Sequence, residues 1–151
     1  IQEQMQRNIS LKGEYFLTDS INVMLEHGAK FRTNTVEVWL DAGIPDALLE
    51  TNRYYLDHGN DNSAKAALRP GVAVIPPVYI APDAQISASV IGPHVSVGAG
   101  VKLDHVIVSD SIIEAGTCLS HQLVKESHIG RNVVLNGTAH KIDIGDNSSI
   151  K

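Results

Sequence analysis

Residues 91–108 read IGPHVSVGAGVKLDHVIV, and aliphatic side chains recur along them at intervals of five or six. The same spacing extends in both directions and includes Ile80, Ile86, Ile91, Val97, Leu103, Val108, Ile113, Leu119, Val124, Ile129 and Leu135. An amphipathic helix needs intervals of three and four, and a half-buried strand alternates at every second residue. The spacing therefore indicates a chain that repeats a short strand and a turn.

Three such sides close one turn of a prism, so that corners stack at Ile80, Val97, Ile113, Ile129 and Ile144. Parallel strands of successive turns then lie about 4.8 Å apart and enclose an aliphatic ladder. Small residues follow the inward aliphatics, as in Ile91-Gly92 and Val97-Gly98, where we expect sharp backbone turns. The sequence predicts a mainly β fold over residues 72–151, a left-handed parallel β-helix of hexapeptide repeats.

The composition of the 151-residue chain narrows the function classes. All aromatic residues lie within the first 79 positions, which fits a prism interior too narrow for rings. Acidic residues outnumber basic ones by 17 to 12 without a basic run, so we expect no nucleic-acid partner. A single cysteine, Cys118, excludes an internal disulfide and favours a reducing compartment, so we expect a cytoplasmic protein. No apolar run is long enough to span a membrane, so we expect no membrane partner.

The pattern of the first 58 residues predicts two helices, then a strand, then a third helix. Residues 2–9 form the end of a helix, and Thr18 is the expected N-cap of a second helix that Gly28 ends. A strand is expected over residues 31–40, and a third helix begins at Pro45. The apolar sides of the second and third helices are expected at Ile21, Met24, Leu25, Ala47, Leu48, Asn52, Tyr55 and Leu56.

These patterns predict three segments. Residues 1–58 are part of an α/β layer without its sheet, residues 59–71 are a polar linker, and residues 72–151 are the β-helix. Because the chain begins at Ile1 and not at a methionine, we expect it to be part of a longer protein.

Three motifs in the first half carry a family resemblance. They are Gly13-Glu14-Tyr15-Phe16-Leu17-Thr18-Asp19, Val38-Trp39-Leu40-Asp41-Ala42-Gly43-Ile44-Pro45 and Leu49-Glu50-Thr51-Asn52-Arg53. In this order, followed by hexapeptide repeats, they resemble the C-terminal part of the sugar-1-phosphate nucleotidyltransferases. The glucose-1-phosphate thymidylyl- and adenylyltransferases with an appended β-helix are the nearest types. The resemblance implies transfer of a nucleotide from a nucleoside triphosphate to a sugar 1-phosphate, with release of pyrophosphate.

The resemblance also implies roles for three residues. Asp41 matches one of two carboxylates that hold the catalytic Mg²⁺, a hard ion that prefers carboxylate and phosphate oxygens. Its structural alternative is to cap the Pro45 helix or stabilise the turn. Trp39 and Thr18 match positions that line the sugar pocket, with core packing and a plain N-cap as their alternatives.

The family's glycine-rich triphosphate loop, its first metal aspartate and its Glu-Lys-Pro segment have no counterpart in this sequence. We therefore assign no catalytic residue and expect the chain by itself to be inactive. The β-helix is expected to serve oligomerisation or regulation, because exposed coil faces favour self-association.

Two other functions stay open. Hexapeptide coils also form acetyltransferases, and such an enzyme acting on an amino sugar would need a histidine base. The candidates in the coil are His94, His105, His121, His128 and His140, all expected at outward or corner positions. The second alternative is a non-enzymatic assembly module in which Asp41 binds no ligand.

Overall fold

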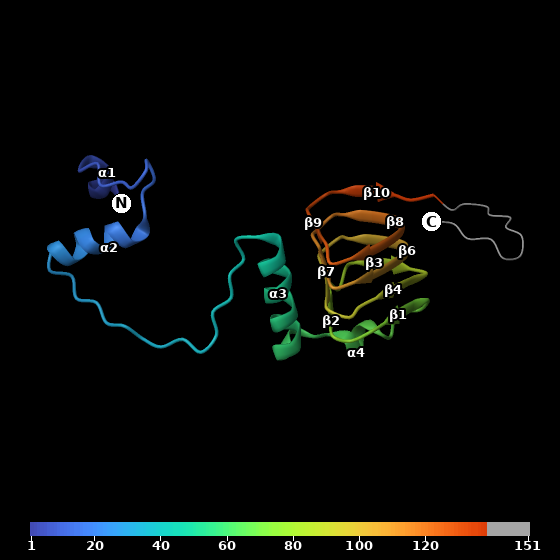
Figure 1. Ribbon diagram of the computed structural model, residues 1–151. Coiled ribbons are helices and arrows are strands. Elements are labelled where there is room, and N and C mark those ends of the chain that lie inside the picture. The colour runs from blue at the N-terminus through green and yellow to red at the C-terminus, as the bar shows by residue number, and fades with distance from the viewer. Residues whose placement is uncertain (139–151) are drawn as a thin grey trace, which may run out of the picture. The chain divides into compact units, whose positions relative to one another are not determined.

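The computed structural model describes residues 1–138 of the chain (Figure 1). The chain divides into two compact units, one comprising Ile1–Trp39 and one that begins at Leu40. Among the described residues, no helix combines the length and the apolarity that a membrane crossing requires.

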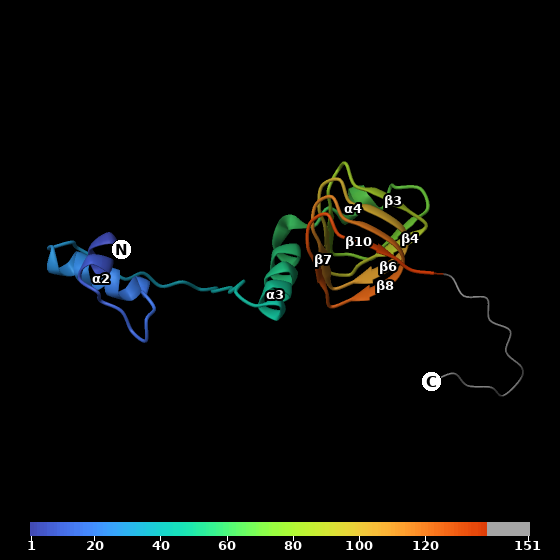
Figure 2. The same ribbon diagram turned by 90° about the horizontal axis from the view of Figure 1, so that it is seen from above.

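The second unit is dominated by stacked short parallel strands, as Figures 1 and 2 show. One sheet has the order β1 (Val72–Val74), β4 (Ser89–Ile91), β6 (Lys102–Ser109), β8 (Cys118–Lys125) and β10 (Val134–Asn136), and β3 (Gln85–Ser87) also pairs with β6. The other has the order β2 (Val78–Ile80), β5 (Val95–Val97), β7 (Ser111–Ile113) and β9 (His128–Ile129). The chain is a parallel β-helix of about four turns, so the predicted fold class is confirmed.

The coil has three faces, because β6 and β8 each bend at a residue with positive φ, His105 and His121. The polar face consists of β3, Lys102–Asp104, Cys118–Ser120 and β10. The apolar face consists of β1, β4 and the later parts of β6 and β8. The helix-covered face is the sheet β2-β5-β7-β9.

The register of the strands matches the predicted corners. Ile80 pairs with Val97, Val97 with Ile113, and Ile113 with Ile129. Of the predicted inward aliphatics, those between Ile80 and Val124 are buried except Ile86, which is partly buried like Ile129. Leu135 is 42% exposed, and Ile144 lies outside the described residues.

Each side of the prism also has a second inward position, which the spacing did not predict. It is occupied by Val78, Ser89, Val95, Val101, Val106, Ser111 and Thr117, all of them buried. The hydroxyl of Ser89 donates to Ser87 O (2.6 Å) and accepts from Val106 N (3.0 Å). Ser111 makes the equivalent pair of bonds, so these hydroxyls connect neighbouring turns of the coil.

Residues 59–71, expected as a linker, close the first turn of the coil. They contain α4 (Ser63–Ala66), and the side chain of Asn62 exchanges two hydrogen bonds of 2.9 Å with the backbone of Ile80. The guanidinium of Arg69 donates to Ala84 O at 2.6 Å and Ala81 O at 3.1 Å. These bonds satisfy backbone groups of the first turn, which has no preceding turn to pair with.

The first unit contains α1 (Gln2–Gln6) and α2 (Leu17–Glu26). Buried Gln4 in α1 accepts a hydrogen bond of 2.5 Å from Ser20 in α2. Gly28 follows α2 with φ of 78°, and Ala29 N donates to Met24 O at 3.0 Å, which confirms the predicted helix end.

Three predictions for the first unit are wrong. Phe16 is the N-cap of α2, so Thr18 lies inside the first turn, because the helix begins at Leu17, two residues earlier than an N-cap at Thr18 implies. Met24 and Leu25 are about half exposed, and the buried residues of α2 are Ser20 and Val23. Residues 31–40 form no strand, since no described segment provides them with a hydrogen-bonding partner.

Helix α3 (Pro45–Tyr55) begins at Pro45 as predicted and is followed by η1 (Leu56–Asn60), in which His58 and Gly59 leave the helical conformation. Leu49 and Leu56 are its buried residues, whereas Tyr55, expected on the apolar side, is 56% exposed. The helix contacts β7, and η1 contacts β2, so both lie along the helix-covered face (Figures 1 and 2).

Candidate functional site

Asp41 lies in a short turn just before α3. Its Oδ1 accepts a hydrogen bond of 2.9 Å from Gly43 N, and its backbone oxygen accepts one of 3.0 Å from the hydroxyl of Thr51. The side chain is exposed, and its second carboxylate oxygen makes no hydrogen bond with the described residues. Asp41 therefore stabilises the turn, which was one of its two predicted roles, and still offers an oxygen to a ligand.

The described residues do not form a complete metal site. No group of three or more histidine, cysteine, aspartate or glutamate side chains among residues 1–138 is arranged to hold an ion. Mg²⁺ needs near-octahedral oxygen coordination, and Asp41 alone supplies at most one or two of those oxygens. The residues at this turn fit a contribution to a metal site but not a whole site.

Thr18 and Trp39 belong to the first unit, whereas Asp41 belongs to the second. Thr18 is exposed in the first turn of α2. Trp39 is 82% exposed at the end of the irregular stretch, so it is not the core residue that its structural alternative suggested. The structure does not test the role of either residue in a sugar pocket.

Three successive residues of α3 make the contacts that sequence reasoning missed. Thr51 bonds the Asp41 backbone, as described above. Asn52 donates to His94 O at 3.2 Å and accepts from the Ser96 hydroxyl at 2.5 Å. Arg53 forms a bidentate ion pair with Asp110. A signal was present in the sequence, because Asn52 is a polar residue on the predicted apolar side of this helix.

The ion pair fixes the charges of its members. The hydrogen bonds from Arg53 hold the pKa of Asp110 below its usual range, and partial burial of the carboxylate opposes this shift. The same bonds raise the pKa of Arg53. Both groups are therefore charged over the whole physiological pH range.

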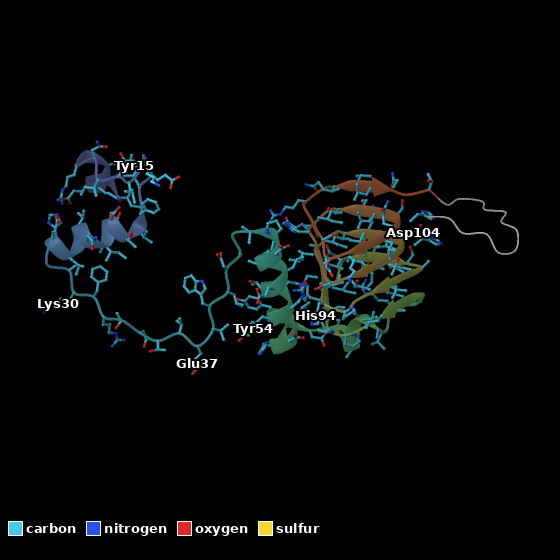
Figure 3. All side chains as sticks on the ribbon, viewed as in Figure 1. Tyr15, Lys30, Glu37, Tyr54, His94 and Asp104 are labelled. Atoms are coloured by element: carbon cyan, nitrogen blue, oxygen red, sulfur yellow. The ribbon has the colours of Figure 1, made fainter. Side chains whose placement is uncertain are left out.

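The histidines of the coil lie at the surface, as predicted, and each described one has a neighbouring polar group. His94, labelled in Figure 3, bonds Asp57 at 2.9 Å, and His128 bonds Glu114 at 2.8 Å. His105 contacts Asp104 at 3.0 Å and stacks on His121 with ring centroids 4.9 Å apart. His140 lies outside the described residues.

The polar face has a shallow hollow of about 330 Å³ beside this histidine pair. It is lined by Ser87, Lys102, Asp104, Cys118, Ser120 and Asn136, among others. The hydrogen bond that Asp104 accepts from Ser87 lowers the pKa of its carboxyl, and the hydrogen bond from His105 lowers it further. The Asp104 carboxylate therefore accepts hydrogen bonds from two side chains beside the hollow.

The fold and the α3 contacts define a parallel β-helix that carries an attached helical segment. No protein-family profile matches the chain. The chain is similar to the glucose-1-phosphate thymidylyltransferase of Streptomyces antibioticus, with 26% identity over 165 aligned positions. The alignment covers 94% of this chain and 46% of that protein, so the chain spans about half the length of the relative. This distant similarity and the β-helix fold are consistent with the C-terminal β-helix of a nucleotidyltransferase.

Proposed function

We propose that the chain is the C-terminal portion of a sugar-1-phosphate nucleotidyltransferase. The observation that carries the proposal is a similarity to a thymidylyltransferase that covers 94% of the chain and therefore includes both the helical segments and the coil. In the proposed reaction, a phosphate oxygen of the sugar 1-phosphate attacks the α-phosphorus of a nucleoside triphosphate. The new phosphorus–oxygen bond replaces the bond to pyrophosphate, which leaves.

The proposal assigns Asp41 to metal binding and Trp39 and Thr18 to the sugar pocket of the whole protein. Bound Mg²⁺ neutralises phosphate charge in reactions of this class. The exposed, singly bonded carboxylate of Asp41 supports its role, and the indole of Trp39 offers an exposed flat surface. Among the described residues, Asp41 is the one carboxylate that we assign to the metal site. We therefore propose that the chain by itself is inactive.

The coil is proposed to take part in self-association. Outward side chains on the apolar face form an in-register row of Ala73, Val90, Ile107 and Leu123. Leu123 is 79% exposed and Ile107 is 53% exposed. A row of four rungs about 4.8 Å apart covers roughly 200 Å², well below the roughly 800 Å² per partner of a stable interface. The row therefore supports a weak contact that other surfaces must supplement.

The experiment for the proposed activity is an assay of pyrophosphate release by the full-length protein. Each nucleoside triphosphate is paired with glucose 1-phosphate and other sugar 1-phosphates, with and without Mg²⁺. We expect release that depends on both substrates and on the metal, and none from the 151-residue chain. Release by neither protein, together with acetyl transfer from acetyl-CoA to an amino sugar, would support the acetyltransferase alternative instead.

A further inference from the structure

The residues Thr51, Asn52 and Arg53 occupy one turn of α3 and contact three different parts of the second unit. Thr51 bonds the backbone of the Asp41 turn at 3.0 Å. Asn52 bonds strand β5 through Ser96 and the corner before it through His94 O. Arg53 pairs with Asp110, at the corresponding corner one turn further along the coil. One helical turn thus joins the Asp41 turn to two turns of the coil.

The coil side of this connection is held by backbone hydrogen bonds. His94 and Asp110 both have positive φ, of 56° and 49°, at stacked corners. Asp110 N donates to Pro93 O at 2.8 Å, and Ser111 N donates to His94 O at 3.1 Å. The backbone hydrogen bonds between turns therefore fix His94 O and the Asp110 carboxylate, which bind Asn52 and Arg53. Neither corner can move without breaking bonds to its neighbouring turn.

Helix α3 is also held in the second unit by buried side chains. Leu49 and Leu56 are buried, with 5% and 3% of their surfaces exposed. His94 adds a bond of 2.9 Å to Asp57 in η1, just after α3. The helical turn that carries Thr51 is therefore held between the coil corner at Asp110 and the Asp41 turn.

We propose that Thr51, Asn52 and Arg53 are positioning residues through which the coil sets the place of the Asp41 carboxylate. The inference rests on the proposed function, because a shift of Asp41 affects catalysis only if Asp41 binds the metal. The β-helix then acts on the site through α3, and a ligand or partner that shifts the corner at Asp110 changes the position of Asp41.

The test is ¹⁵N relaxation on the 151-residue chain, which reports the order parameter of the Gly43 amide. A rigid backbone amide has an order parameter of about 0.85 and a flexible one below about 0.6. We expect a value near the rigid limit in the wild type and a flexible value in Thr51→Val and in Asp110→Asn. Thr51→Ser keeps the hydroxyl and should retain the wild-type value.

The matched control is Asp104→Asn, which removes the charge of a coil carboxylate on the polar face, away from α3 (Figure 3). It should leave Gly43 unchanged. A rigid Gly43 in Asp110→Asn would overturn the proposal. If Asp110→Asn does not fold, Arg53→Lys, which removes the bidentate geometry but keeps the charge, must loosen Gly43 or the proposal is wrong.

The functional measurement uses the full-length protein and the same substitution. Asp110→Asn should lower kcat for pyrophosphate release while KM for the sugar phosphate stays within about twofold, since binding groups are untouched. Equal losses in Asp104→Asn would contradict a specific positioning role. If Asp41→Asn keeps the full rate, the metal assignment of Asp41 fails, and if the full-length protein releases no pyrophosphate at all, the proposed function fails; neither outcome changes the relaxation result on Gly43.

Discussion

Arg53 and Asp110 lie 57 positions apart in the sequence and meet in a bidentate ion pair, with Nε to Oδ1 at 2.6 Å and Nη2 to Oδ2 at 2.5 Å. The pair joins the helix before the coil to a corner inside it. Because Arg53 is 39% exposed and Asp110 20% exposed, solvent screens part of the attraction.

Replacing Asp110 with alanine should lower the free energy of unfolding by about 1 kcal/mol at neutral pH. The loss depends on pH, because the folded-state pKa of Asp110 lies below its usual range. The stabilisation is fully present above the unfolded-state pKa of about 3.9 and is lost as the pH falls through the lower folded-state pKa. Urea unfolding of wild type and variant between about pH 7 and pH 2 measures this. A difference that grows on acidification would contradict the assignment.

Gly92 turns the chain between two faces, with φ of 114°, and an added Cβ would collide with the backbone oxygen of Ile75. Gly92→Ala should therefore lower stability by more than about 3 kcal/mol. Gly100→Ala is the control, since Gly100 also has positive φ (65°) but no atom within 4 Å of the added group. It should cost only about 1 kcal/mol. Equal midpoints in thermal unfolding would mean that the collision is relieved by a backbone shift.

Thr117 is completely buried and joins two turns of the coil. Its hydroxyl donates to Gly130 O at 2.7 Å and accepts from Val133 N at 3.1 Å. Thr117→Val keeps the shape but leaves both groups unpaired, so it should cost about 1–3 kcal/mol in urea unfolding. Ser120→Ala removes an exposed hydroxyl that bonds Asn136 and should change stability by less than about 0.5 kcal/mol. A neutral Thr117→Val would show that water replaces the hydroxyl.

Leu123, in the row on the apolar face, is 79% exposed. If this row contributes to self-association, Leu123→Lys should lower the average mass measured by light scattering at high micromolar concentration, because it introduces a charge into the contact. Ser120→Lys, on the polar face, should leave the mass unchanged. A wild type that is monomeric throughout this range would contradict the proposed association.

The coil could be predicted from the sequence because its aliphatic residues repeat at a fixed interval, and Ile80, Val97, Ile113 and Ile129 pair as expected. The second inward position was missed because serine and threonine occur there as well as valine, and their burial depends on hydrogen bonds between turns. The strand over residues 31–40 was wrong because a strand requires a partner, and β propensity alone does not supply one.

The candidate site was predictable only in part. The helix that begins at Pro45 follows from local sequence and is found there. The metal role of Asp41 follows only from the family resemblance and stays a prediction, whereas its bond to Gly43 N matches the turn role given as its alternative. The contacts of Asn52 and Arg53 involve residues 42 and 57 positions away, whose meeting depends on the number of residues in each coil turn. No local sequence pattern predicts these long-range contacts.

The central claim is that Asp41 serves nucleotidyl transfer in the whole protein. The most direct measurement compares pyrophosphate release by full-length wild type, Asp41→Asn and Asp46→Asn in the presence of Mg²⁺. Asp46 is the exposed acidic residue in the first turn of α3 and serves as the matched control. We predict that Asp41→Asn loses at least about a hundredfold in kcat, with Asp46→Asn near the wild-type rate. Equal rates in all three proteins would contradict the assignment.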